Sequence, residues 1–545
     1  MNLFLVEKQQ NLDSYCVIGV KPDMHKRIGD MYYEQRLIQD QITKLTGRRF
    51  ALGYYNDLEQ YKALLDNGAE FAEQYDIKSG VKLSPSQMRR LTTDLVWLEN
   101  QEITLADGTK QTVTVPKVYL RSRNTDVNTA GSLISAKYID LKSGDIDTQG
   151  AIVGFDGNTL RANNLNITGK VVGGSVNIDA TNKVNIDGGS VTAEDKLFVK
   201  GKTVDIKTTT SSYGNGSELS SGTVIDRVAG LHLTGSDKAD ALNAIVVQTE
   251  NDINLKGAKI TNNAQNKGIT QLIAKNGSVN IDTVKTLRKE GFGKLTDKNH
   301  RQLSIEQEVG SNINSNTSIV IKAGDKVNIR QGDINSTAGH IGIRGEKGVE
   351  ISEGRDKERI KGATYDKHKG FLSLSTTKTI RRYDNQNNVA ISSNITGKTV
   401  AVQSGKDADI NITGSNILSD DGTSVEAGGK VTIEAAKNYS RHNDFKQTKK
   451  SGFTASLSGG VASIGYGKSR SSLDQKGAST SLTGSIINSR NGNNTVIAGD
   501  DLNLIASKVS AGGDVSLRGK NVNLLTGAEE NCPVRTTDSS FFNYD

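Results

Sequence analysis

The stretch Ala498–Gly527, AGDDLNLIASKVSAGGDVSLRGKNVNLLTG, states one motif three times: an apolar–polar–apolar triplet that follows small or turn-forming residues. Its triplets begin at Leu502, Val515 and Val522, at steps of 13 and then 7 residues. Similar triplets recur within 176–206 at steps of 8, 13 and 7, and within 319–351 at steps of 8, 14 and 8. A long and a short step together give a period of 20–22 residues.

This period predicts a parallel β-helix. A triplet is a short strand with two side chains inward and one outward, and Gly, Asn and Asp supply the corners between strands. If each turn stacks on the previous one, aliphatic side chains form continuous rungs, as in other solenoids. No proline occurs between Pro116 and Pro533, which suits an uninterrupted hydrogen-bond ladder. We expect a right-handed rod of roughly twenty turns and about 100 Å.

The composition agrees with a repeat protein rather than a large globular core. The chain has 545 residues, of which 34% are hydrophobic and 5% aromatic, and it contains 57 glycines. The net charge of +7 comes from interspersed charges of both signs, so no nucleic-acid partner is expected. The two cysteines, Cys16 and Cys532, permit neither a disulfide framework nor a zinc site.

A different pattern precedes residue 120 and predicts an α+β module over residues 1–125. Apolar spacing predicts helices near 28–46 and from Asn56/Asp57 to a stop at Gly68. A third helix is expected over 84–98, with Ser84 as its cap. The sequence around Asp107-Gly108 predicts a hairpin. Trp97 is expected in the core of this module, with a partner-binding role as the alternative.

The remaining chain divides by the same reasoning into β-helix over 126–440, a Gly/Ser-rich hairpin over 441–480, β-helix over 481–526 and an irregular tail over 527–545. Loops or hairpins are expected to leave the rod within 211–230, 286–310 and 358–388, where the period fails. The hairpin at 441–480 carries four apolar residues that alternate with small or polar ones and are candidates for contact with a membrane or target surface: Phe453, Leu457, Ile464 and Tyr466.

Several phrases resemble the haemagglutinin repeats of filamentous-haemagglutinin-like exoproteins: AGDKVNI (323–329), AGGKVTIEAAKN (427–438) and AGDDLNLIAS (498–507). SGFTASLSGGVASIGYGKS (451–469) is similar to the Gly/Ser excursion in the second repeat block of that family, which is found in contact-dependent growth-inhibition proteins. The segment before residue 120 also resembles the module upstream of those repeats.

The resemblance implies a non-catalytic rod, secreted or exposed on the outer membrane of a Gram-negative bacterium. It implies a role in adhesion or as the stalk that delivers a toxin by contact. The implied partners are an outer-membrane two-partner-secretion transporter, acting on the parent protein, and the surface of a host cell or neighbouring bacterium. Because no signal peptide, secretion domain or toxin domain is recognised, a fragment or a non-secreted, truncated remnant is the expected status.

An enzyme is the remaining alternative, because polysaccharide lyases and hydrolases also use parallel β-helices. Asp179, Asp187 and Asp205 lie next to triplets, where converging acids would be needed. Their simpler interpretation is that they sit in corners and bond the backbone. The six histidines are scattered, and no phosphate loop or calcium-repeat motif occurs. We therefore expect no catalytic residues, no cofactor and no metal.

Overall fold

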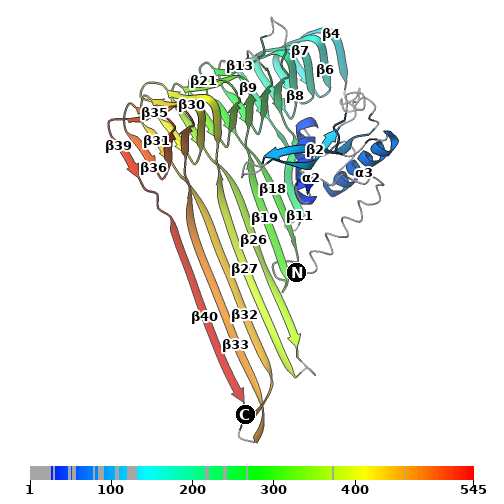
Figure 1. Cartoon of the computed structure of the whole chain (residues 1–545), viewed down its shortest axis with the longest axis vertical. Helices are drawn as coiled ribbons and strands as arrows, with labels where there is room; N and C mark the ends of the chain where they lie inside the picture. The colour runs from blue at the N-terminus through cyan, green and yellow to red at the C-terminus, as the bar shows by residue number, and fades with distance from the viewer. Residues whose placement is uncertain are drawn as a thin grey trace. The chain divides into compact units, whose positions relative to one another are not determined.

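The computed structural model describes residues 26–28, 31–46, 51, 57–75, 77, 80–83, 91, 93–104, 110–119, 132–214, 220–236, 242–265, 268–370, 374–458 and 461–544. The chain divides into two compact units, Met1–Ser132 and Leu133–Asp545. Each unit is described by itself below, and Figure 1 shows the elements of both.

The first unit is a small α+β module. Its strands β1 (Lys26–Arg27), β3 (Lys110–Tyr119) and β2 (Leu95–Thr104) form one sheet in that order, with helices α2 (Met31–Thr46) and α3 (Asp57–Tyr75). The predicted hairpin is confirmed because β2 and β3 pair antiparallel; its turn, 105–109, lies outside the described residues. Both predicted helices are present, but α3 continues past Gly68. A Cβ at Gly68 would lie 2.2 Å from the Val96 carbonyl oxygen, so this glycine permits close packing instead of ending the helix.

The third predicted helix is wrong where the structure describes it. Leu95 and Leu98 lie in strand β2, while residues 84–90 lie outside the described residues. Strand β2 is buried on both faces: Leu95 and Trp97 join one apolar cluster, and Val96 joins another. Trp97 is 4% exposed and its indole N–H donates to the Val81 carbonyl at 2.6 Å. It is therefore a core residue, as expected.

The second unit contains a parallel β-helix, which confirms the predicted fold. Each turn contributes to three stacks of parallel strands, which we call faces A, B and C. The decisive test is met: Asn494 pairs with Val515 and Val496 with Leu517 in parallel register, one period of 21 residues apart. The triplets of the opening stretch therefore lie on top of the strands one turn earlier.

The strands and their bounds follow chain order. The long strands β4, β6, β7, β8, β28 and β30 turn corners without a break, and the shorter strands are separate. The bounds are β4 (Leu133–Lys142), β5 (Asp145–Thr148), β6 (Ala151–Ile167), β7 (Lys170–Asp187), β8 (Ser190–Gly201), β9 (Thr203–Lys207), β12 (Gly230–Leu233), β13 (Ala244–Thr249), β14 (Ile253–Lys256), β15 (Lys259–Asn262), β16 (Ile269–Ala274), β17 (Val279–Asp282), β20 (Asn312–Ser315), β21 (Ser318–Ala323), β22 (Lys326–Arg330), β23 (Asp333–Ser336), β24 (His340–Gly345), β25 (Gly348–Ser352), β28 (Asn394–Ser404), β29 (Ile410–Thr413), β30 (Asn416–Ala427), β31 (Val431–Glu434), β34 (Ile486–Ser489), β35 (Asn493–Ala498), β36 (Leu502–Ile505), β37 (Lys508–Ala511), β38 (Val515–Arg518) and β39 (Val522–Leu525).

Face A contains β12, β15, β20, β23, β34 and β37 together with the first parts of β8, β28 and β30. Face B contains β13, β16, β21, β24, β35 and β38 together with the second parts of β8, β28 and β30. Face C illustrates the stacking. Its strands pair in the order β5, β6, β7, β9, β14, β17, β22, β25, β29, β31, β36 and β39. Inward residues along this stack, such as Val279, Val327 and Ile410, are essentially inaccessible. Among the described residues the rod thus has twelve turns and a length of about 50–60 Å. The expectation of twenty turns was wrong because it counted residues that leave the rod as turns.

The residues that leave the rod form a second sheet, which we call the hairpin sheet. Its antiparallel strand order is β10-β11-β18-β19-β26-β27-β32-β33-β40. The bounds are β10 (Thr209–Tyr213), β11 (Ser220–Arg227), β18 (Val284–Phe292), β19 (His300–Val309), β26 (Gly354–Lys369), β27 (Ser375–Ile391), β32 (Ala436–Ser458), β33 (Val461–Thr483) and β40 (Glu530–Tyr544). The expected excursions are therefore hairpins that pair with one another. The expected irregular tail is wrong, because β40 pairs along β33.

Hairpins leave face C at every second turn. They follow β9, β17, β25 and β31, and β40 follows β39, whereas the chain turns directly into face A after β14, β22, β29 and β36. Strand spacing explains this alternation. One hairpin contributes two strands to the hairpin sheet, and two turns advance the β-helix by two strand spacings of the same size, about 4.8 Å each. The hairpins can therefore pair side by side without a gap (Figure 1).

Candidate functional site

A buried serine holds each of three long hairpins at its point of return. Ser311, Ser393 and Ser485 are at most 1% exposed and lie directly before the next face A strand. Each hydroxyl donates to the carbonyl of the last residue of the departing strand, at 2.7–2.9 Å, and accepts from a backbone amide of the adjacent turn, at 2.9–3.1 Å. The departing carbonyls belong to Asp282, Ser352 and Glu434, and the amides to Ala258, Gly332 and Ser415. Without the hydroxyl, the backbone amide would lack a partner at a corner where the ladder is broken. Each carbonyl would still accept from a backbone N–H at 3.0 Å, that of Gly257, Gln331 or Gly414.

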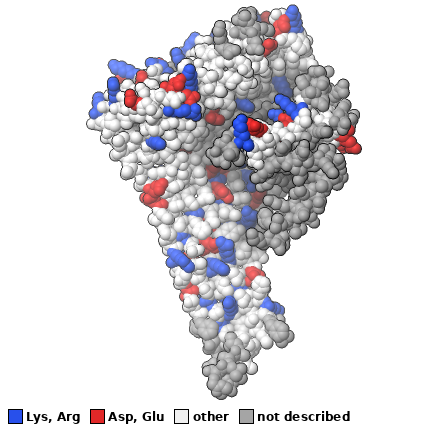
Figure 2. Space-filling model, viewed as in Figure 1, with Lys and Arg blue, Asp and Glu red and all other residues white. Residues whose placement is uncertain are grey.

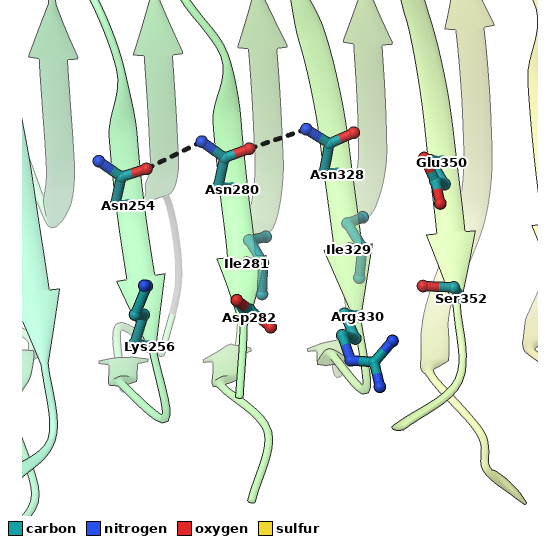
Figure 3. Close-up of a pocket in the computed structure, with 10 residues that line it drawn as sticks. All are labelled: Asn254, Lys256, Asn280, Ile281, Asp282, Asn328, Ile329, Arg330, Glu350 and Ser352. Atoms are coloured by element: carbon teal, nitrogen blue, oxygen red, sulfur yellow. Dashed lines mark hydrogen bonds between the residues drawn. The ribbon is translucent and has the colours of Figure 1, made fainter. Parts of the chain in front are cut away.

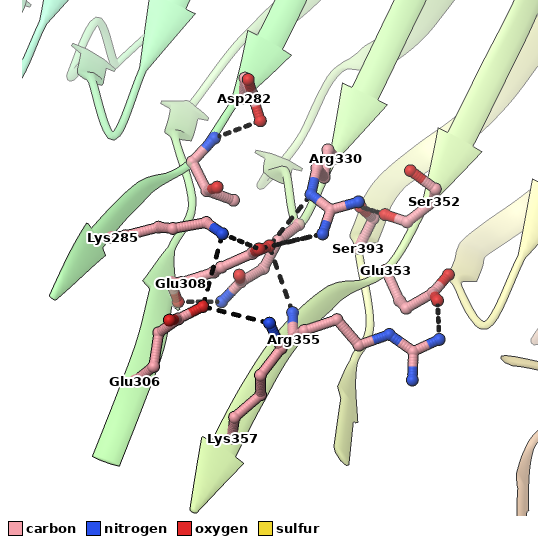
Figure 4. Close-up of polar contacts among 12 residues, drawn as sticks. Asp282, Lys285, Glu306, Glu308, Arg330, Ser352, Glu353, Arg355, Lys357 and Ser393 are labelled. Carbon is pink, nitrogen blue, oxygen red and sulfur yellow. Dashed lines mark hydrogen bonds and ion pairs between the residues drawn. The ribbon is translucent and has the colours of Figure 1, made fainter. Parts of the chain in front are cut away.

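An ion network fixes the base of the hairpin sheet. The Glu308 carboxylate, 4% exposed, accepts two hydrogen bonds of 3.0 Å from the Arg330 guanidinium and lies 3.8 Å from the Lys285 ammonium. It also accepts from the Arg355 backbone N–H at 3.2 Å. Because Arg330 ends a β-helix strand while the other residues belong to hairpins, the network ties the hairpin sheet to the rod (Figure 4). A bidentate guanidinium–carboxylate pair suits such a fixed angle.

Ion pairs lie on both faces of the hairpin sheet. Each ion pair can be assigned to one face because the side chains of directly paired residues lie on the same face. Lys285 and Lys357 lie within 3.4 Å of Glu306, and we call this side the Glu306 face. Burial alone would raise the pKa of Glu306, but these two lysines hold that pKa below its ordinary value. On the other side, the Asp444 face, Arg381 hydrogen-bonds Asp444 and lowers the pKa of its carboxyl.

These lowered pKa values predict acid sensitivity of the hairpin sheet. A carboxyl whose pKa is lower in the folded state stabilises the fold above its unfolded pKa of about 4 and loses that contribution as the pH falls through the folded value. Asp384, paired with Arg359, behaves like Glu306 and Asp444. Below pH about 4 we expect amide hydrogen exchange in β19, β26, β27, β32 and β33 to accelerate, beyond its intrinsic pH dependence, before exchange in the β-helix does. Equal acceleration in both sheets would contradict this expectation.

The candidate contact residues lie at the far end of the β32–β33 hairpin. Phe453 pairs directly with Tyr466 across the hairpin, with ring centroids 5.5 Å apart in an edge-on arrangement. Phe453 is 57% exposed and Ile464 is 76% exposed. The pairing places all three side chains on the Glu306 face. The side chain of Leu457 lies outside the described residues, although its backbone is in β32. The structure thus brings three of the four predicted residues together.

A shallow groove on face C was not anticipated from the sequence (Figure 3). It runs over a row of asparagines in which each side-chain N–H donates to the next carbonyl oxygen at 2.8 Å: Asn328 to Asn280, and Asn280 to Asn254. Asp282 and Glu350 also line the groove, from β17 and β25. They lie two strands apart, with the whole of strand β22 between them, and they are offset by two residues along the strands.

The aspartates considered for catalysis belong to polar rows on the rod. Asp205 accepts a hydrogen bond from Asn254 at 2.8 Å and forms an ion pair with Lys183 at 2.6 Å. Asp179 lies 3.9 Å from Lys200. These contacts join neighbouring turns instead of bonding the local backbone, so the corner interpretation was wrong in detail. Asp187, whose Oδ1 is buried without a partner among the described residues, is aligned with Lys207 of the next turn.

The five described histidines lie on five different strands, and His25 lies outside the described residues. His300 Nδ1 lies 2.8 Å from the Asp297 carbonyl, and His368 contacts Asp366. Burial, with a smaller contribution from Lys259, lowers the pKa of His232 to about 4. Within the part of the chain that the structure describes, no three metal-ligating side chains cluster. No described helix is long and apolar enough to span a membrane.

Comparisons with known proteins identify the repeats. The pattern of the family described as Hemagglutinin repeat matches residues 372–472 and 464–544. These segments contain the β32–β33 hairpin, β40 and the last turns of the rod. No solved structure matches the chain significantly.

Three curated relatives match nearly the whole chain. The chain is 24% identical to Toxin CdiA of Yersinia pestis over 95% of its own length, and 26% identical to the 16S rRNA endonuclease CdiA of Enterobacter cloacae over 96%. It is 27% identical to the tRNA nuclease CdiA-2 of Burkholderia pseudomallei over 93%. The matches cover only 17–18% of each relative, so the chain corresponds to a small part of those proteins. The chain is therefore a distant relative of the CdiA proteins, and its residues 372–544 belong to the haemagglutinin repeat family.

Proposed function

We propose that this chain is a non-catalytic display rod on the outside of a Gram-negative cell, acting in adhesion or as a stalk for contact-dependent toxin delivery. The β-helix supplies length and stiffness, and the hairpin sheet carries side chains away from the rod. The observation that carries the proposal is the lengthening of the hairpins along the chain, from β10–β11 to the 23-residue strands β32 and β33. The relationship to the CdiA proteins supports the same assignment.

Export by an outer-membrane two-partner-secretion transporter is part of this proposal. A chain that folds turn by turn needs only contacts with the preceding turn, so folding can proceed as residues emerge. The near absence of cysteine suits passage of an unfolded chain, because no closed loop forms on the way. The nuclease activities in the relatives' names belong to those proteins. The residues described above support no catalytic role for this region.

The far end of the β32–β33 hairpin is the proposed contact with the target surface. Phe453, Leu457, Ile464 and Tyr466 are the residues assigned to this role, and exposed apolar side chains gathered at one place are typical of interaction sites. Two of them, Phe453 and Ile464, are more than half exposed. Phe453 packs edge-on against Tyr466, yet most of its surface and most of that of Ile464 remain open to a partner.

A tip variant tests the proposal. We expect the purified chain, fluorescently labelled, to bind intact Gram-negative cells in flow cytometry, and the double variant Phe453→Ser/Ile464→Ser to lose most of this binding. The matched control is Tyr439→Ser/Val389→Ser, which removes two exposed apolar side chains, 51% and 43% exposed, nearer the base of the sheet. Equal binding by the tip variant and the control, or no binding by the unaltered chain, would refute the contact role.

A further inference from the structure

Four cations lie directly opposite one another near the far end of the hairpin sheet. Lys367 pairs with Lys378, Lys378 with Lys449, and Lys449 with Arg470, on the successive strands β26, β27, β32 and β33. We call these four residues the cationic row. Like charges directly opposite each other in an antiparallel sheet are destabilising. All four residues are exposed, so water lowers this cost without removing it.

Elsewhere the same sheet matches its cations with acids. Arg359 hydrogen-bonds Asp384 at 2.7–2.9 Å, and the lysines at the base surround Glu306. Among the described residues, no ion pair involves any member of the cationic row. Arg470 is held by a neutral group: with the Gln447 amide oxygen turned toward it, Arg470 donates from Nη2 and Nε at 2.9 and 3.1 Å. Asp538, on β40, is aligned one row nearer the base.

Further cations and two aromatic residues lie on the same face of the hairpin sheet as the cationic row. Pairing places Lys369 and Lys468 on the Glu306 face one row farther toward the tip, and Lys468 lies 5.7 Å from the centre of the Tyr466 ring. The row is thus bordered by further cations and then by the exposed Phe453 and Tyr466 rings. In Figure 2, Lys and Arg side chains are interspersed with Asp and Glu side chains down the viewed face toward the lower end of the long hairpins.

We propose that the cationic row binds a linear acidic polysaccharide that lies across the strands. The four charges recur at the strand spacing, about 4.8 Å, in a straight line. A chain of uronic acid units carries one carboxylate per sugar ring at a similar repeat, so successive carboxylates meet successive cations. The phosphates of one B-DNA strand wind around a helix, with about 3.4 Å of axis per phosphate, so they do not form a straight line like this row. The neighbouring aromatic rings offer flat faces for the C–H side of a sugar.

This inference deepens the proposed display function, on which it rests for its biological setting. It assigns the ligand class to a row of residues different from the four tip residues. An anionic lipid surface is the competing occupant, and it differs in requiring the apolar tip as well as charge. The two possibilities therefore separate in a binding experiment.

The experiment measures binding of polygalacturonate to the full chain by isothermal titration calorimetry, with neutral dextran as the negative probe. We expect polygalacturonate to bind, dextran not to bind, and added salt to weaken the complex because its contacts are ionic. The variant Lys378→Gln/Lys449→Gln is expected to bind at least about tenfold more weakly. The matched control is Lys446→Gln/Lys450→Gln, which removes two charges from the opposite, Asp444 face of β32 and is expected to change affinity less than about twofold.

The substituted residues are exposed, and circular dichroism checks that each variant folds. A change in binding therefore reports the lost charges and not a loss of structure. Lys449→Arg, which keeps the charge, is expected to bind like the unaltered chain. Equal loss in both double variants, or binding only to vesicles of anionic phospholipid, would overturn the inference. Cell binding that survives Lys378→Gln/Lys449→Gln would overturn only this ligand assignment. Loss of cell binding in the tip variant with intact polygalacturonate binding would separate the two sites.

Discussion

Replacing Ile412 by alanine is expected to lower the free energy of unfolding by about 2–5 kcal/mol, the usual range for such a truncation in a packed core. Ile412 is inaccessible to solvent and stacks in register between Ile351 of the previous turn and Ile433 of the next, both equally buried. The cavity cannot collapse easily, because the backbone ladders above and below fix the spacing of the rungs.

The loss should be local as well as large. In a solenoid each turn contacts mainly its neighbours, so the turns that contain β25, β29 and β31 are expected to lose hydrogen-exchange protection first. The control is Asn411→Ala on the same strand, whose side chain points outward and whose removal is expected to cost less than about 0.5 kcal/mol. Similar denaturation midpoints for both variants would contradict the assignment of the rungs as the source of stability.

Replacing Ser485 by alanine is expected to cost about 1–3 kcal/mol, because it leaves the buried Ser415 amide without a partner. The hydroxyl satisfies the Ser415 amide at 3.1 Å and the Glu434 carbonyl at 2.7 Å, and it is fully buried. Water cannot replace the hydroxyl there without opening the corner, so the amide stays unsatisfied, whereas the Glu434 carbonyl keeps the Gly414 N–H at 3.0 Å. It should loosen the point where the longest hairpin leaves and rejoins the rod.

The measurement is chemical denaturation together with hydrogen exchange of the Ser415 amide. The matched control is Ser471→Ala on the exposed surface of β33, expected to stay within about 0.5 kcal/mol of the unaltered chain. An unchanged exchange rate at Ser415 in the Ser485→Ala variant would show that the hydroxyl does not hold the corner.

The candidate contact surface was only partly predictable. Alternation of apolar and small residues was enough to place Phe453, Ile464 and Tyr466 on one face of a hairpin, because that inference needs only the period of a strand. The cationic row was not predictable, since its four members extend from Lys367 to Arg470 and two directly paired members, Lys378 and Lys449, are 71 residues apart in the sequence. Their alignment depends on the register between two hairpins, which no local pattern encodes.

The failed helix over 84–98 has a similar cause. Leu91, Leu95 and Leu98 have helical spacing, but a strand covered by apolar clusters on both faces also reads as a nearly continuous apolar run. Only the pairing of β2 with β3 distinguishes the two.

The amino-acid sequence by itself determined the β-helix, because its information is periodic and local: a triplet, a corner and a step that returns to the same face. It also determined where the chain leaves that pattern. What only the tertiary structure decided is that the departing segments, and the tail 530–544 with them, pair into one sheet. The reason is geometric. A hairpin leaves the rod at every second turn and adds two strands to the hairpin sheet, and two turns lengthen the rod by the same two strand spacings. Segments far apart in the sequence therefore become neighbours.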